Sequence, residues 1–174
     1  MKERAGHLSI KGKPLTWLGE EIKAGQKAPD YRVRTGFGPE ATVTLADSKG
    51  KIRIISVAPS LDTGVCEMQA IRFNQEVEKL GADIEVHQIT VDLPPAMTRF
   101  CNTKLNGSVK IKTFSDYAER SFGQAYGFLI KEWQTLGRGI VIIDKNDTVA
   151  YVEYCPKIEE LPNFDVALAA LKGL

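Results

Sequence analysis

The stretch RIISVAPSLDTGVCEMQAIRFNQEVEKL, residues 53–80, carries the pattern that predicts the fold. Residues 53–58 are β-branched and almost continuously apolar, which is typical of a strand covered on both faces. After a loop over residues 59–65, apolar side chains recur at spacings of four, three, four and three, namely Cys66, Ala70, Phe73, Val77 and Leu80. This spacing predicts a helix over about residues 66–80, and Gly81 is expected to end it.

Further strands and helices alternate on both sides of this unit. Before it, residues 7–17 predict a hairpin with its turn at Gly12, residues 18–40 are loop-like, and residues 42–45 alternate like a short strand. After it, the pattern predicts strands at 84–91 and 109–112, helices at about 95–105, 117–126 and 164–171, and a second hairpin with strands at 139–144 and 148–154. Pro94 and Pro95 suit the first turn of the helix at 95–105.

This order of elements indicates an α/β protein with a mixed central sheet covered by helices on both faces. A thioredoxin-like fold with an N-terminal β-hairpin extension fits the order best. A flavodoxin-like fold is the competitor, but its sheet is all parallel, and the hairpin over residues 140–154 argues against it. A chain of 174 residues is expected to form one domain over residues 1–174, with residues 1–17 as the extension.

Composition excludes several classes of function. The 23 basic and 22 acidic residues leave a net charge of +1, so we expect no nucleic-acid partner and no anionic membrane surface. The longest aliphatic run, residues 140–143, is too short to span a membrane, and residues 1–4 lead into no apolar segment typical of a secretory signal. The two histidines are 80 positions apart and no phosphate-binding loop is present, so we expect no metal and no cofactor.

The chain has three cysteines, Cys66, Cys101 and Cys155, and Cys66 stands where a buried strand, a loop and a helix meet. Sites in open α/β sheets lie at the carboxyl ends of strands. A thiol in the first turn of a helix also faces unpaired backbone N–H groups and the positive end of the helix dipole, which favour the nucleophilic thiolate. Asp62 or Thr63 is the expected N-cap. The alternative is that Cys66 is only the first core residue of its helix, and its position alone does not decide between the two.

The loop sequence is more specific than its position. Residues 59–66, P-S-L-D-T-G-V-C, resemble the P-x-x-x-T-x-x-C active-site loop of the peroxiredoxins. With Arg72-Phe73-Asn74 in the following helix, the segment is similar to the thiol peroxidase subfamily of atypical two-cysteine peroxiredoxins. The resemblance extends over nearly the whole chain, because residues 9–16, 92–94, 99–101 and 124–127, and the strand at Arg138, follow in family order.

The resemblance implies a thiol-dependent peroxidase that reduces hydrogen peroxide and organic hydroperoxides through a sulfenic acid on Cys66. By the same match, Pro59 shields the sulfur from water and Thr63 hydrogen-bonds the peroxide. The backbone N–H groups of Val65 and Cys66 donate to the bound oxygens, and Arg138 polarises thiolate and peroxide. Without the resemblance, the favoured interpretation of Arg138 is a solvated arginine at the entrance of a strand, which is the commoner fate of an arginine.

Cys101 follows Cys66 by 35 positions, so the two do not form a C-x-x-C pair. Both lie early in a helix that follows a strand, which places them at the same edge of the sheet, on the same face or on opposite faces. The family match makes Cys101 the resolving cysteine, which condenses with oxidised Cys66 to an intramolecular disulfide; the alternative is a helix-face residue without redox function. Cys155 matches no family motif, and we interpret it as a structural thiol.

The resemblance also implies thioredoxin as the reductant, a homodimer and a place in the cytoplasm of a bacterium. One alternative keeps the fold and the disulfide but removes the catalysis: a non-catalytic redox switch or sensor, in which oxidation changes partner binding.

Overall fold

The strand predicted at residues 53–58 is the strand β5 (Ile52–Val57), and all six of its residues are buried. The computed structural model describes residues 1–174. In it, β5 lies inside a seven-stranded mixed sheet of order β10-β9-β5-β6-β7-β3-β4. It pairs in parallel with β6 (Ile84–Thr90) and antiparallel with β9 (Gly139–Ile143). Neighbours on both edges and cover on both faces explain why its sequence is almost continuously apolar.

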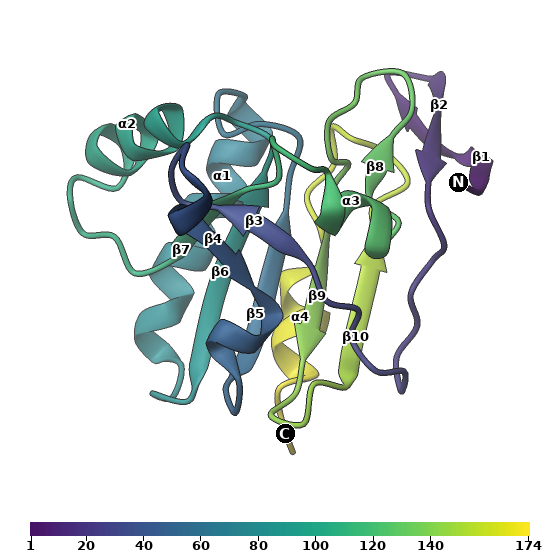
Figure 1. The fold of residues 1–174 in the computed structure, drawn as a ribbon. Helices are drawn as coiled ribbons and strands as arrows, with labels where there is room; N and C mark the ends of the chain where they lie inside the picture. The colour runs from purple at the N-terminus through teal and green to yellow at the C-terminus, as the bar shows by residue number, and fades with distance from the viewer.

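The remaining strands complete this sheet and form a small second one (Figure 1). The other strands of the main sheet are β3 (Arg32–Arg34), β4 (Thr42–Thr44), β7 (Lys112–Ser115) and β10 (Val149–Tyr154). The second sheet has the order β1-β2-β8, with β1 (Glu3–Ile10), β2 (Lys13–Leu18) and β8 (Leu129–Ile130). Because β9 and β10 are antiparallel, the sheet is mixed and the all-parallel flavodoxin-like alternative is wrong.

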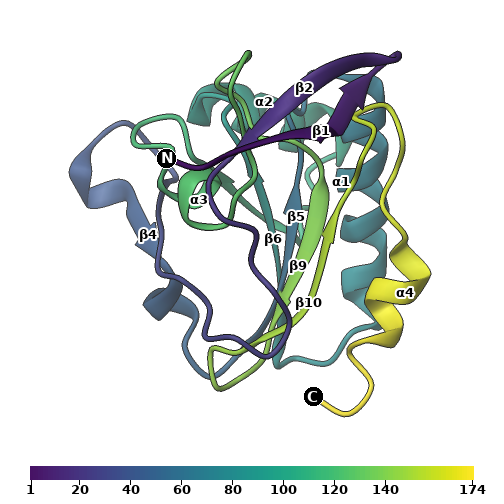
Figure 2. The ribbon, with the colours of Figure 1, turned by 90° about the vertical axis from the view of Figure 1, so that its right-hand side faces the viewer.

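One face of the main sheet is covered by three helices, α1 (Gly64–Glu76), α2 (Pro94–Lys104) and α4 (Phe164–Ala169). Their buried side chains form one cluster of 14 residues with Ile52 and Ile54 of β5. Figure 2 shows α1 and α4 side by side on this face of the sheet. The helices that carry Cys66 and Cys101 therefore lie on the same face of the sheet. This is expected because α1 connects β5 to β6 and α2 connects β6 to β7, two successive right-handed crossovers that run in the same direction along the sheet.

The opposite face is covered by the N-terminal part of the chain and by α3 (Ser121–Ala125). Ile55 and Val57 point to this side, because side chains along a strand alternate between faces, and they join a cluster of 21 buried residues. The N-terminal hairpin turns at Lys11 and Gly12, whose φ values of 47° and 76° are those of a tight hairpin turn. The thioredoxin-like α/β fold with its N-terminal strand pair is confirmed.

Several predicted segments differ from the structure. The stretch 18–40, which its glycines and prolines predicted to be a loop, contains the strand β3. This strand pairs through hydrogen bonds with β4 and β7. The strand predicted at 109–112 begins at Lys112 instead, and Val109 is exposed. The helix predicted over 66–80 begins at Gly64 and ends in a 3-10 turn at Val77–Lys79. Two more such turns, Pro39–Ala41 and Leu45–Ser48, flank β4.

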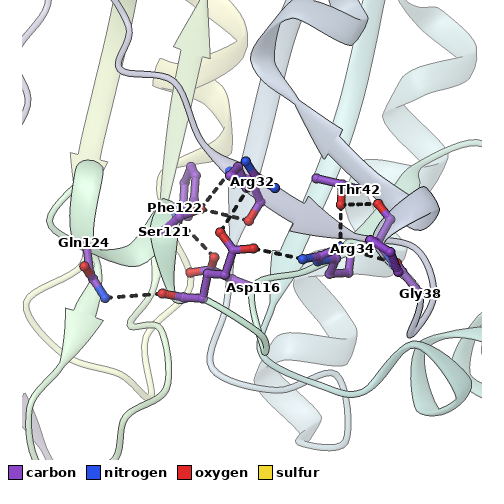
Figure 3. A network of polar contacts seen from close by, with 10 residues as sticks. Arg32, Arg34, Gly38, Thr42, Asp116, Ser121, Phe122 and Gln124 are labelled. Atoms are coloured by element: carbon purple, nitrogen blue, oxygen red, sulfur yellow. Dashed lines mark hydrogen bonds and ion pairs between the residues drawn. The ribbon is translucent and has the colours of Figure 1, made fainter.

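The helix predicted over 117–126 is shortened to α3 by a buried carboxylate. Asp116 accepts hydrogen bonds from the backbone N–H groups of Phe122 at 3.1 Å and Gly123 at 2.8 Å. Arg120 just before the helix has a φ of 54°, which no helical residue adopts. Figure 3 shows this junction, where Ser121 also exchanges hydrogen bonds with the backbone of Arg32 in β3. Burial raises the pKa of Asp116 to about 7.

Candidate active site

The sulfur of Cys66 lies in the loop-to-helix junction after β5, where the sequence analysis expected a reactive thiol. Cys66 occupies the first turn of α1, and its exposed fraction is 0%. Its Sγ lies 2.9 Å from the hydroxyl oxygen of Thr63 and 3.2 Å from Nη2 of Arg138. Two polar groups that can donate hydrogen bonds therefore converge on one buried sulfur, so Cys66 is more than a core residue of its helix.

Thr63 stands at the N-cap position of α1, as expected, but its side chain does not cap the helix in the usual way. Its hydroxyl makes no hydrogen bond to a backbone N–H of the first turn. Instead, Oγ1 lies within reach of two acceptors, the carbonyl of Ser60 at 3.2 Å and the sulfur of Cys66. The hydroxyl is thus directed toward the sulfur of Cys66 and the carbonyl of Ser60.

Arg138 immediately precedes β9 and is almost completely buried, at 1% exposure. Its guanidinium donates three hydrogen bonds: from Nε to the carbonyl of Ile158 at 2.8 Å, from Nη1 to Oε1 of Gln69 at 2.6 Å, and from Nη2 to the sulfur. A buried guanidinium with every nitrogen engaged is fixed in position and keeps its charge. The alternative interpretation as a solvated arginine at a strand entrance is wrong.

Gln69 is a residue of the site that the sequence analysis missed. It is fully buried on α1, one helical turn after Cys66. Its Nε2 donates to Oγ of Ser56 at 2.9 Å and to the carbonyl of Val57 at 3.1 Å, so its Oε1 faces Arg138. A glutamine on the buried side of a helix needs partners for both ends of its amide, and this was the signal available in the sequence.

The first backbone N–H groups of α1 lie outside the hydrogen-bond ladder of the helix. The first hydrogen bond within α1 runs from the N–H of Glu67 to the carbonyl of Thr63, so the N–H groups of Val65 and Cys66 precede the helical ladder. Pro59 is buried directly after β5, at the base of the same loop. Pro59 lies in the loop that carries Thr63, and Val65 lies in the first turn of α1 beside Cys66; their roles toward a substrate stay predictions.

Cys101 lies on α2, buried in the cluster that α1 and α2 share. Its nearest polar partner is the hydroxyl of Thr113, at 4.0 Å from Sγ, and burial raises the pKa of its thiol. Both Cys66 and Cys101 are free thiols with different partners. A cavity of about 310 Å³ lies between the Cys66 loop and α2; its lining includes Thr63, Glu67, Phe100 and Lys104.

Cys155 is also a buried free thiol, but no donor approaches its sulfur. Its Sγ lies 4.0 Å from Oε1 of Glu153, and burial, followed by the charge of that carboxylate, raises the pKa of Cys155 to about 12. The thiol therefore stays protonated at neutral pH, in line with the interpretation as a structural residue.

His87 lies on β6 and packs edge-on against the ring of Phe114. Burial lowers the pKa of His87, and its Nε2 lies 3.0 Å from Glu85. No group of three or more His, Cys, Asp and Glu side chains is arranged to hold a metal ion. None of the helices is long and apolar enough to cross a membrane.

Comparison with known proteins identifies the family. A family model described as Redoxin matches residues 23–171. The chain belongs to the Redoxin family. This redoxin is 45% identical to the thiol peroxidase of Bacillus subtilis (strain 168) over 167 residues, which cover 96% of the chain and 97% of its relative. The resemblance to thiol peroxidases noted in the sequence is confirmed.

Solved structures agree with this assignment. The redoxin superimposes on a peroxiredoxin-like protein from Aquifex aeolicus with a TM-score of 0.84 and 32% identity, covering 97% of each chain. It superimposes on a thiol peroxidase from Chromobacterium violaceum with a TM-score of 0.80 and 19% identity, covering 95% of this chain and 94% of that one. At the lower identity the likeness shows the fold alone.

Proposed function

We propose that Cys66 is the nucleophile of this thiol-dependent peroxidase and that Cys101 resolves its oxidised form. One observation carries the proposal: the hydroxyl of Thr63 lies 2.9 Å, and Nη2 of Arg138 lies 3.2 Å, from the buried sulfur of Cys66. The sequence around this cysteine, residues 59–66, resembles the active-site loop of the peroxiredoxins. Hydrogen bonds from a cation and a hydroxyl stabilise negative charge on sulfur, and the thiolate is the form that attacks.

In the first step, the Cys66 thiolate attacks one oxygen of a hydroperoxide. A sulfur–oxygen bond forms, the oxygen–oxygen bond breaks, and the other oxygen leaves as hydroxide or alkoxide and takes up a proton. Cys66 is thereby oxidised to a sulfenic acid, while the peroxide is reduced to water or an alcohol.

The surrounding donors act on the charge that develops in this step. Arg138 is held by Gln69 and the carbonyl of Ile158, so its Nη2 is already in place when the leaving oxygen becomes negative. The N–H groups of Val65 and Cys66 and the hydroxyl of Thr63 orient the two oxygens in line with the sulfur. Pro59 keeps water from the sulfur.

In the second step, the thiol of Cys101 attacks the sulfenic sulfur of Cys66. A disulfide forms and the sulfenic oxygen leaves as water. The position of α1 and α2 on one face of the sheet supports this pairing, because both cysteines then lie at the same edge and on the same side. A dithiol protein reduces the disulfide and restores both thiols.

The finer assignments come from the family. We propose hydrogen peroxide and organic hydroperoxides as substrates, thioredoxin as the dithiol reductant, a homodimer as the assembly and the bacterial cytoplasm as the location. Full-length similarity to a bacterial thiol peroxidase supports these assignments.

Disulfide mapping after one equivalent of hydrogen peroxide tests both cysteine roles together. We expect a single disulfide, between Cys66 and Cys101, formed within a rapid-mixing experiment. The Cys101→Ser variant should keep the fast first oxidation and lose recycling by thioredoxin. A disulfide from Cys66 to Cys155 would contradict the role of Cys101. Oxidation of Cys66 no faster than that of a free thiol would favour the redox switch over the peroxidase.

A further inference from the structure

The carboxylate of Asp92 connects the Cys66 loop to the segment that leads into α2. Asp92 stands between β6 and α2. Its Oδ1 accepts a hydrogen bond from the hydroxyl of Ser60 at 2.6 Å, and its Oδ2 accepts one from the backbone N–H of Leu61 at 2.6 Å. The hydroxyl of Thr90 donates to Oδ2 at 2.8 Å. Two of the three donors therefore come from the loop that carries Thr63.

These bonds are strong but involve no cation. Hydrogen bonds to an ionised carboxylate are shorter and roughly twice as strong as those between neutral groups. The donors are two hydroxyls and one amide, all of which water can replace. The attachment therefore holds the loop firmly and can still be released and re-formed.

The attachment continues to the reacting sulfur. Ser60, held by Asp92 through its side chain, offers its backbone carbonyl to the hydroxyl of Thr63 at 3.2 Å. The same hydroxyl lies 2.9 Å from the sulfur of Cys66. A carboxylate that fixes Ser60 and Leu61 thus fixes the backbone from which Thr63 reaches the sulfur.

The residues that make these bonds line the cavity between the Cys66 loop and α2. The cavity of about 310 Å³ between the Cys66 loop and α2 is lined by Ser60 and Leu61 on one side and by Phe100 on the other, with Asp92 among its walls. A disulfide requires Cα atoms about 4.4–6.8 Å apart. Cys66 and Cys101 are free thiols with different partners, so their contacts with Thr63, Arg138 and Thr113 have to open before the two sulfurs bond.

We propose that Asp92 is a positioning residue that acts in opposite directions on the two steps of turnover. Its hydrogen bonds to Ser60 and Leu61 hold the loop in the arrangement that attacks peroxide, and they have to open before Cys66 meets Cys101. The proposal rests on the roles proposed above for the two cysteines. Asp92 touches neither cysteine, so it acts through the loop.

The Asp92→Asn variant tests the proposal. Asparagine keeps the size of the side chain and one acceptor oxygen, but its amide NH₂ replaces an acceptor, so one of the loop's donors loses its partner. Rapid quenching, with chemical trapping of sulfenic acid and mass mapping of the disulfide, measures the two steps separately. We expect the first oxidation to slow by about 10-fold. Disulfide formation should become at least threefold faster. The sulfenic acid on Cys66 then has less time to react with a second peroxide, so less sulfinic acid accumulates.

Asp62→Asn is the matched control. Asp62 is an exposed carboxylate in the same loop and lines the same cavity, and the substitution removes the same charge. Both steps should stay within twofold of the unmodified protein. A general effect of charge would move the two variants alike and would contradict the proposal.

Ser60→Ala provides a second variant if Asp92→Asn fails to fold, as judged by circular dichroism and thermal unfolding. It removes one hydrogen-bond donor to Asp92. As in Asp92→Asn, the first oxidation should become slower and disulfide formation faster, but by smaller factors. Equal changes in the two steps, a slower disulfide step or no change would each overturn the role of Asp92. The unmodified protein distinguishes failure of the role of Asp92 from failure of the proposed function. If the unmodified protein forms no Cys66–Cys101 disulfide, the proposed function itself is contradicted.

Discussion

Cys66 and Cys155 are both buried, and both contact Arg138, but in different ways. The sulfur of Cys66 faces the guanidinium, whereas Cys155 donates its backbone N–H to the carbonyl oxygen of Arg138 at 2.9 Å. A hydroxyl and a guanidinium reach the sulfur of Cys66, whereas the hydrogen-bond partner of the Cys155 sulfur is a carboxylate oxygen of Glu153. Burial is common to both thiols, so the groups that face the sulfur decide which one can carry a negative charge.

The largest expected effect follows from exchanging each thiol in turn. Cys66→Ser should lower the rate of peroxide consumption by on the order of 10⁴-fold or more, because the nucleophile is lost. Cys155→Ala should leave the rate within about twofold, because its thiol is protonated at neutral pH. Peroxide consumption with thioredoxin as the reductant measures both. Loss of activity in Cys155→Ala, with its fold intact, would break the comparison.

A smaller effect on the rate of peroxide consumption is expected when Arg138, which contacts both cysteines, is changed. Arg138→Lys keeps the charge, but an ammonium group cannot reach Gln69, Ile158 and the sulfur from fixed fork positions. We expect the first oxidation of Cys66 to slow by roughly 10²-fold, as for the loss of one preorganised donor. Stopped-flow oxidation with excess hydrogen peroxide measures it.

Cys155 provides the internal control for this variant. Its contact with Arg138 is made by the backbone, which the substitution leaves in place. The rate at which iodoacetamide modifies Cys155 should therefore stay unchanged. If both thiols change together, Arg138→Lys has altered the packing around the strand and the two surroundings are not independent.

The fold could be predicted largely from the sequence because most of its signals are local. The apolar run of β5, the spacing of apolar residues in α1 and the hairpin at 139–154 each lie within one short segment. The wrongly predicted elements depend on contacts with residues outside their own segments. The strand β3 exists through its partners β4 and β7, and the length of α3 is set by the side chain of Asp116, which precedes the helix.

The same distinction applies to the candidate site. Thr63 and Cys66 are three positions apart, and the motif at residues 59–66 that contains both indicated both as residues of the site. Arg138 is 72 positions from Cys66, and only the family resemblance placed it at the sulfur. Gln69 and Asp92 were missed because their partners, Arg138 and the loop at Ser60, meet them through the tertiary fold.

The smallest effect concerns stability at high pH and sharpens the comparison from the side of Cys155. Its pKa is raised from 9.0 to about 12 in the folded protein, first by burial and then by Glu153. The folded state therefore holds the thiol proton more tightly than the unfolded state. Stability is fully present below pH 9.0 and falls as pH rises from there toward about 12.

Between those limits, the free energy of unfolding should decrease by about 1 kcal/mol per pH unit through this one group. Cys155→Ala lacks the thiol and should lose less stability over the same range, although tyrosines and lysines titrate in both proteins. Urea unfolding of the two proteins at pH 8, 9 and 10 gives the difference directly. Parallel curves would show that the Cys155 thiol ionises as easily in the folded protein as in the unfolded chain. The surroundings of Cys155 would then not oppose the ionisation of its thiol in the way that the structure indicates.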